Sequence, residues 1–64
     1  MNRNEGWDWL CAHFGESKAM SIVSMCVDYP DKLEAIATTQ FHASDPRRQQ
    51  LRISIRTIME SENK

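Results

Sequence analysis

The spacing of hydrophobic positions predicts a helix in the N-terminal segment. Apolar side chains recur there at intervals of three and four residues, so on a helix they form a single stripe. Asn4 can cap a helix that begins at Glu5, and Asp8 adds a favourable acidic charge in its first turn. Gly15 suits the position after the helix end, whereas Gly6 weakens the first turn. The stripe consists of Trp7, Leu10, Cys11 and Phe14.

The second apolar segment, residues 18–28, carries hydrophobic side chains on two sides of the helix that we expect there. Ser17 can cap this helix. The two apolar groups are Met20, Val23 and Val27 on one face and Ile22, Met25 and Tyr29 nearly opposite. A helix that is apolar on two sides is either central or shared with another subunit. A strand is the competing interpretation, because residues 21–27 are rich in β-branched side chains, but their apolar positions do not alternate cleanly.

Proline marks the start of the two remaining helices. Pro30 disfavours helix at the residue before it and suits the first turn of a third helix. The apolar face expected for that helix is Leu33, Ile36, Ala37, Gln40 and Phe41. Asp45 followed by Pro46 combines a side-chain cap with proline at the first helical position. This pair predicts a last helix, with Leu51, Ile55, Ile58 and Met59 as its buried face.

The last segment also fits a strand, because apolar and polar residues alternate perfectly over residues 51–56. A lone strand needs a partner strand, and the helix start signal at Pro46 favours helix. We therefore predict one all-α domain, residues 1–64, with three to four short helices and a frayed tail over residues 60–64. An α+β fold with a C-terminal strand is the alternative.

The length of 64 residues suggests that the chain needs a partner. Surface scaling gives about 4,200 Å² of exposed surface, and the hydrophobic gain nearly equals the cost of ordering the chain. Self-association through the doubly apolar second helix would supply the missing core, so we expect a homodimer. The residues assigned to this self-association are Met20, Ile22, Met25 and Tyr29.

Charge is unevenly distributed although the net charge is only −1. Residues 1–45 contain three basic and seven acidic side chains, a net charge of −4, whereas residues 46–59 contain four arginines and no acid. The basic patch consists of Arg47, Arg48, Arg52 and Arg56. On a helix the last three form a stripe that could follow a phosphate backbone or select a partner with an acidic surface. Nucleic acid is therefore a possible partner, although the carboxylates elsewhere in the chain also need counterions.

The residues that could carry chemistry do not form a catalytic or metal-binding pattern. Cys11 and His13 point about 200° apart on a helix, and the chain lacks the paired ligand spacings of structural zinc sites. No glycine-rich elbow or phosphate loop is present, so we expect no enzyme, metal or cofactor. The polar N-terminus has no apolar stretch of a signal peptide, which indicates a reducing cytoplasmic compartment with both cysteines free. No apolar run is long enough to span a membrane.

The tryptophans indicate a partner-binding surface. Trp9 lies about 200° around the first helix from Trp7, and exposed tryptophan is a favoured interface anchor. We expect Trp9, with Trp7 and Phe14 behind it, to contact a partner. The sequence therefore favours a small non-enzymatic regulatory or inhibitory protein that binds another macromolecule, such as a bacterial or phage accessory protein. A nucleic-acid-binding regulator that docks its arginines on phosphates is the alternative.

Overall fold

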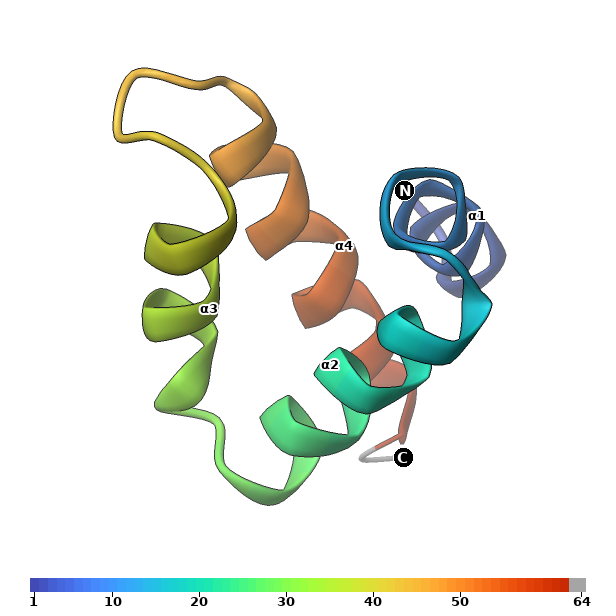
Figure 1. The fold of residues 1–64 in the computed structure, drawn as a ribbon. Coiled ribbons are helices and arrows are strands. Elements are labelled where there is room, and N and C mark those ends of the chain that lie inside the picture. Colours follow the sequence, from blue (N-terminus) through green and yellow to red (C-terminus); the bar gives the residue numbers. More distant parts are fainter. Residues whose placement is uncertain (63–64) are drawn as a thin grey trace.

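Four helices account for most of the chain in a computed structural model that describes residues 1–62 (Figure 1). They are α1 (Arg3–Phe14), α2 (Glu16–Asp28), α3 (Lys32–Gln40) and α4 (Arg47–Glu62). Residues 1–62 contain no strand, so the all-α prediction is confirmed and residues 51–56 are helical. Helix α4 packs against each of the other three helices, and α1 does not pack against α3 (Figure 1). None of these helices is long and apolar enough to cross a membrane.

The first helix begins two residues earlier than expected because Asn2, not Asn4, caps it. The Asn2 side chain accepts a hydrogen bond from the Glu5 backbone N–H at 2.9 Å. The Glu5 carboxylate accepts one in return from the Asn2 backbone N–H at 2.9 Å. This reciprocal pair satisfies two donors at once and needs a glutamate three residues after the cap, which only Asn2 has in this segment.

Gly15 joins α1 directly to α2. Its φ of 85° lies in the left-handed region that favours glycine, and its N–H donates to the Cys11 carbonyl at 2.9 Å. Its own carbonyl accepts from the Ala19 N–H at 3.0 Å and so begins the next helix. Ser17 therefore lies within the first turn of α2, and the expectation that it caps this helix is wrong.

The start of α4 follows the expected combination of a side-chain cap and proline. The Asp45 carboxylate accepts from the Arg47 backbone N–H at 2.9 Å, and the Pro46 carbonyl accepts from the Gln49 N–H at 3.2 Å. The helix then continues through Glu62. Of the expected frayed tail, residues 60–62 therefore lie in α4, and residues 63–64 lie outside the described residues.

The core is built around the apolar stripe of α4. Leu51, Ile55 and Ile58 are fully buried there, and Met59 is half-buried at the edge, as predicted. The core side chains from the other helices are Leu10, Ala19, Ile22, Val23, Cys26, Leu33 and Ala37. The surface of the chain is 4183 Å², close to the value of about 4,200 Å² expected for its mass. The single chain thus buries the usual share of its surface, so surface area alone does not require a second subunit.

Helices α1 and α4 approach closely where Gly6 meets Ser54. A Cβ atom on Gly6 would lie 3.0 Å from the Ser54 carbonyl oxygen and 3.3 Å from Cγ1 of Ile58. Ser54 is fully buried, and its hydroxyl accepts a hydrogen bond from the Gln50 side chain at 3.4 Å. Gly6, which by its helix propensity weakens α1, therefore allows a close contact between the two helices.

Candidate docking groove

An apolar groove runs between α1 and α2 on the surface of the protein. It consists of two hollows of about 260 and 310 Å³, and both are lined by Trp7 of α1 and Met20 of α2. The first hollow continues along α2 past Val23 and Val27, and the second lies beside Cys11. Met20 is 57% exposed and Val27 is 39% exposed, so the groove presents apolar side chains to the outside.

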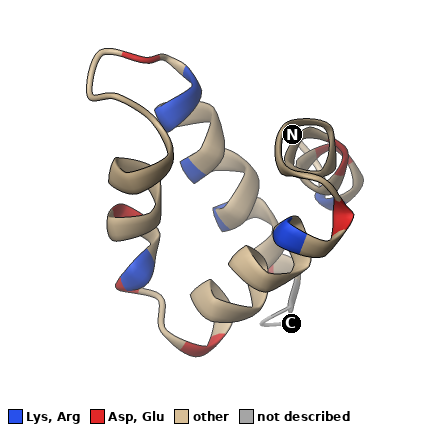
Figure 2. Cartoon of the chain, in the orientation of Figure 1, with Lys and Arg blue, Asp and Glu red and all other residues tan. Residues whose placement is uncertain are grey.

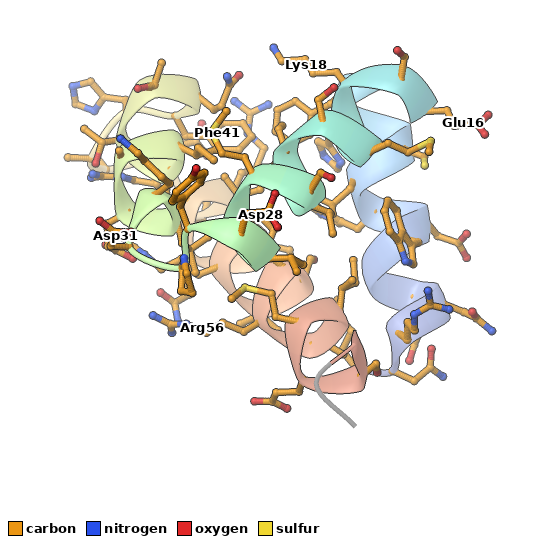
Figure 3. The ribbon with its side chains drawn as sticks, turned by 90° about the horizontal axis from the view of Figure 1, so that it is seen from below. Glu16, Lys18, Asp28, Asp31, Phe41 and Arg56 are labelled. Atoms are coloured by element: carbon orange, nitrogen blue, oxygen red, sulfur yellow. The ribbon has the colours of Figure 1, made fainter. Side chains whose placement is uncertain are left out.

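A carboxylate lies at each end of this groove. Glu16 lines the second hollow and Asp28 lines the first, and they are the first and last residues of α2 (Figure 3). Neither carboxylate forms a hydrogen bond or an ion pair within residues 1–62. The nearest base along α2, Lys18, is held elsewhere: its Nζ donates to Gln40 Oε1 at 3.3 Å and lies 5.5 Å from the centre of the Phe14 ring. The groove is therefore apolar along its floor and acidic at both ends.

The two apolar faces expected on α2 flank one buried face. Ile22 is only 7% exposed and belongs to the core, so its expected place on a self-association surface is wrong for the folded chain. Met20 lies at the edge next to α1. Met25 is exposed about 140° around the helix, and Tyr29, at 60% exposure, follows it just beyond the helix end. The structure thus separates the expected surface into two edges that one flat contact cannot cover together.

Trp9 and Phe14 pack within an aromatic cluster, on a different surface from Trp7. The Trp9 ring stacks on His13 at 4.1 Å and meets the Phe41 ring at 6.3 Å, and the rings of Phe14 and Phe41 lie 5.8 Å apart. Because Phe41 directly follows α3 (Figure 3), the cluster joins α1 to the link between α3 and α4. Arg47 covers it, with its guanidinium carbon 4.8 Å from the centre of the Phe41 ring. Both tryptophans are half-buried, and Trp7 is the one that lines the groove.

Basic residues recur along α4 (Figure 2), and most of these arginines contact other residues of the protein itself. Arg52 forms a two-pronged pair with Glu34 of α3, at 2.8 Å from Nε and 2.9 Å from Nη2. Arg47 binds Asp45 in a similar way, with Nη2 at 2.6 Å. Arg56 is exposed and reaches Glu34 only at 4.0 Å.

Arg48 is half-buried. Its Nη2 donates to the Thr38 hydroxyl at 2.6 Å, whereas its buried Nε has no hydrogen-bond partner within residues 1–62. The basic patch therefore holds α3 and its following link against α4, with Arg56 as its most available charge.

The fold shifts the pKa values of several groups, among them two carboxyls and one thiol. Hydrogen bonds from Arg52 hold the pKa of the Glu34 carboxyl below its ordinary value. Hydrogen bonds from the side chain and backbone of Arg47 do the same for the pKa of Asp45. Burial raises the pKa of the Cys26 thiol, because the thiolate would lose its hydration. All three shifts follow from contacts within the fold, and none of these groups lies in the groove.

Cysteines and histidines are dispersed over the fold. Cys11 and Cys26 are both free thiols. His13 Nδ1 donates to the Trp9 carbonyl oxygen at 2.9 Å, and His42 contacts the Ser44 hydroxyl at 2.9 Å. Within residues 1–62, no three side chains of the metal-ligating types converge on one point. The Cys11 thiol is the only one of these four groups that lines the groove within the described residues.

Comparisons with known protein families, curated proteins and solved structures find no match for this chain. The argument for function therefore depends on the groove itself. Sequence reasoning placed Met20 and Val27 on one helix face, but it did not join them to Trp7, and it missed the contribution of Glu16 and Asp28. One signal was present: the side chains at positions 16, 20 and 27 follow one face of a helix, with acidic residues at both helix ends.

Proposed function

We propose that this protein acts by binding another macromolecule in the groove between α1 and α2, as a small regulatory or inhibitory protein without catalytic chemistry of its own. The observation that carries the proposal is the apolar floor at Met20 and Val27, bounded by two carboxylates that have no partner within the described residues. The exposed Met20 and the half-buried Trp7 supply contact area of the kind that protein-binding surfaces use.

The size of the groove also favours side chains of a partner over an enclosed substrate. Each hollow is at or near the lower limit of about 300 Å³ for small-molecule pockets, and both lie open at the surface. Trp7, which lines both, offers a rigid apolar wall against which a partner side chain can pack.

A matched pair of surface positions tests this proposal. Val27 in the groove and Ile53 on α4 are both β-branched and both 39% exposed. A photo-reactive amino acid is placed at either position in the cells that naturally express the chain. We expect a discrete covalent adduct from position 27 and none of the same mass from position 53. Absence of an adduct at position 27, or the same adducts from both positions, would count against the groove. An adduct of twice the mass of the chain would identify a second copy as the occupant.

Self-association is assigned to the opposite edge of α2. Met25 and Tyr29 are both exposed there, and neither lines the two hollows of the groove. Sedimentation over a concentration series tests this assignment, with Met25→Ser as the variant. We expect the mass to rise with concentration for the unmodified chain and to stay at that of a monomer for the variant. A chain that stays monomeric throughout contradicts the assignment.

Phosphate binding by the arginines is the alternative function, and Arg56 is the observation that favours it. This side chain is 58% exposed and lies 4.0 Å from its nearest carboxylate. If all four arginines contact the phosphates of a duplex, the logarithm of the binding constant should fall with the logarithm of the salt concentration at a slope of about −3.6. If Arg56 alone contacts a phosphate, the slope should be about −0.9. Absence of duplex binding at about 50 mM salt excludes this alternative.

A further inference from the structure

The charges around the groove define what kind of partner it can accept. Its two ends carry Glu16 and Asp28, and Asp8 is exposed on α1 next to Trp7 in the sequence. None of these three carboxylates is paired within residues 1–62. The ammonium of Lys18 is directed to Gln40 and the Phe14 ring, so it does not neutralise the groove. A partner that brings cations to the groove ends would find carboxylates free to receive them.

The spacing of these carboxylates matches the dimensions of a helix. Glu16 and Asp28 are twelve residues apart on α2, which corresponds to about 18 Å along the helix axis. Met20 and Val27 lie between them, about 10 Å apart. A partner helix lying along α2 would place two apolar side chains in the hollows and one basic side chain at each end. Lysines about 11 residues apart lie on one helix face and cover nearly the same length.

A second copy of the same chain does not fit the groove on these grounds. A symmetric contact brings the same patch of both subunits together, so it would bring Glu16 and Asp28 of one copy against those of the other. Like charges placed together at an interface are unfavourable. On α4, Arg47 and Arg52 are paired with Asp45 and Glu34, so Arg56 remains as the exposed cation of the basic patch against a groove with two acidic ends.

We infer that the groove takes an amphipathic helix of another protein, with apolar residues at its centre and a lysine or arginine at each end. This inference depends on the proposed function, because it names the chemistry of the partner for that groove. The apolar side chains enter the two hollows beside Trp7, and the basic side chains reach Glu16 and Asp28. Apolar contact supplies most of the affinity, and the two charges select the partner and its position along the groove.

Two synthetic peptides test the inference. The first is a helical peptide of about 15 residues with lysines about 11 positions apart and leucines between them. The second keeps the leucines and replaces both lysines by glutamate. Binding is followed by Trp7 fluorescence in a Trp9→Phe variant, which keeps an aromatic ring in the cluster. It is followed independently in the unmodified chain by protection of the Cys11 thiol from alkylation. Fully buried Cys26 serves as the internal reference.

We expect the lysine peptide to bind about tenfold more tightly than the glutamate peptide at low salt. This preference should fall to about twofold in a Glu16→Gln, Asp28→Asn double variant, while the Val27→Ser variant weakens both peptides. Equal binding of the two peptides, or binding of neither, overturns the inference. If neither peptide binds but position 27 still yields a specific covalent adduct, the proposed function stands and only the basic helix is wrong. An adduct at twice the mass of the chain would show that a second copy of the chain, and not a basic helix of another protein, occupies the groove.

Discussion

Replacing Gly6 by alanine should destabilise the protein, although the same change stabilises most helices. Alanine exceeds glycine in helix propensity by about 1 kcal/mol, so an exposed Gly→Ala change in α1 would be favourable. At position 6 the new Cβ would lie 3.0 Å from the Ser54 carbonyl oxygen, which belongs to the backbone of α4 and cannot rotate away. It would also lie 3.3 Å from Cγ1 of Ile58, which is fully buried.

The magnitude follows from these two opposing effects. Overpacking a close contact costs about 1–3 kcal/mol, because the two helices must move apart. After the propensity gain of about 1 kcal/mol, we expect a net loss of about 1 kcal/mol in the free energy of unfolding. Gly6→Val adds two further carbons and loses the propensity gain, so its loss should be larger, about 3 kcal/mol.

Urea unfolding followed by circular dichroism measures this loss, with Asn4→Ala as the control. Asn4 is exposed in the first turn of the same helix and does not cap it, so this variant should be as stable as the unmodified chain or slightly more stable. A Gly6→Ala protein that gains about 1 kcal/mol, as at an exposed position, would refute the close approach of α1 and α4.

The remaining predictions concern the aromatic cluster, the α3–α4 ion pair and the two thiols. Trp9→Ala should lower the free energy of unfolding by about 2 kcal/mol, less than the 3–5 kcal/mol of a fully buried aromatic, whereas Trp9→Phe should lose much less. An unchanged urea midpoint for Trp9→Ala would show that the ring does not support the fold. Because pairing with Arg52 lowers the folded-state pKa of Glu34, its stabilisation is present above the ordinary carboxyl pKa and is lost as pH falls through the lowered value. The difference in urea midpoint between the unmodified chain and Glu34→Gln should therefore shrink between about pH 5 and pH 2, and a constant difference contradicts the pairing. In the purified protein, mass spectrometry should find Cys11 alkylated many times faster than Cys26, which is fully buried and has a raised thiol pKa; equal rates would contradict the burial.

The helices could be predicted because their apolar spacing is local. The stripe of Leu51, Ile55 and Ile58 is buried as its periodicity indicates, and Asp45 with Pro46 marks the start of α4. The first helix boundary was missed although the sequence contains its signal. Several polar residues can cap a helix, and only the glutamate three positions after Asn2 distinguishes the true cap.

The roles of the two tryptophans could not be predicted, because they depend on contacts between distant residues. Spacing within α1 separates Trp7 from Trp9 but does not show what covers either ring. Phe41 comes from the end of α3 and covers Trp9, whereas the face of Trp7 between α1 and α2 stays open. Helical periodicity therefore separated the two faces of α1 but did not show that both rings are half-buried or that Trp7 is the one that lines the groove.

The roles of the arginines and of Gly6 also depend on contacts between residues that are distant in the sequence. The pair of Glu34 and Arg52 joins residues 18 positions apart, so the sequence shows the unbalanced charge but not its counterion. Gly6 has an unfavourable helix propensity, but the absence of a side chain lets Ser54 of α4 approach closely. In each of these cases, the tertiary contact decides whether a side chain supports the fold or faces outward.

The reactivity of Cys11 in living cells tests the central claim most directly, because this thiol lines the groove. The alkylation rate of Cys11 is measured in intact cells that naturally express the chain and in the purified protein, relative to an unfolded reference peptide. A macromolecule bound in the groove covers the thiol, so the account predicts a rate at least several-fold lower in the cells. Equal relative rates in cells and in the purified protein would contradict the assignment of this groove as the binding surface.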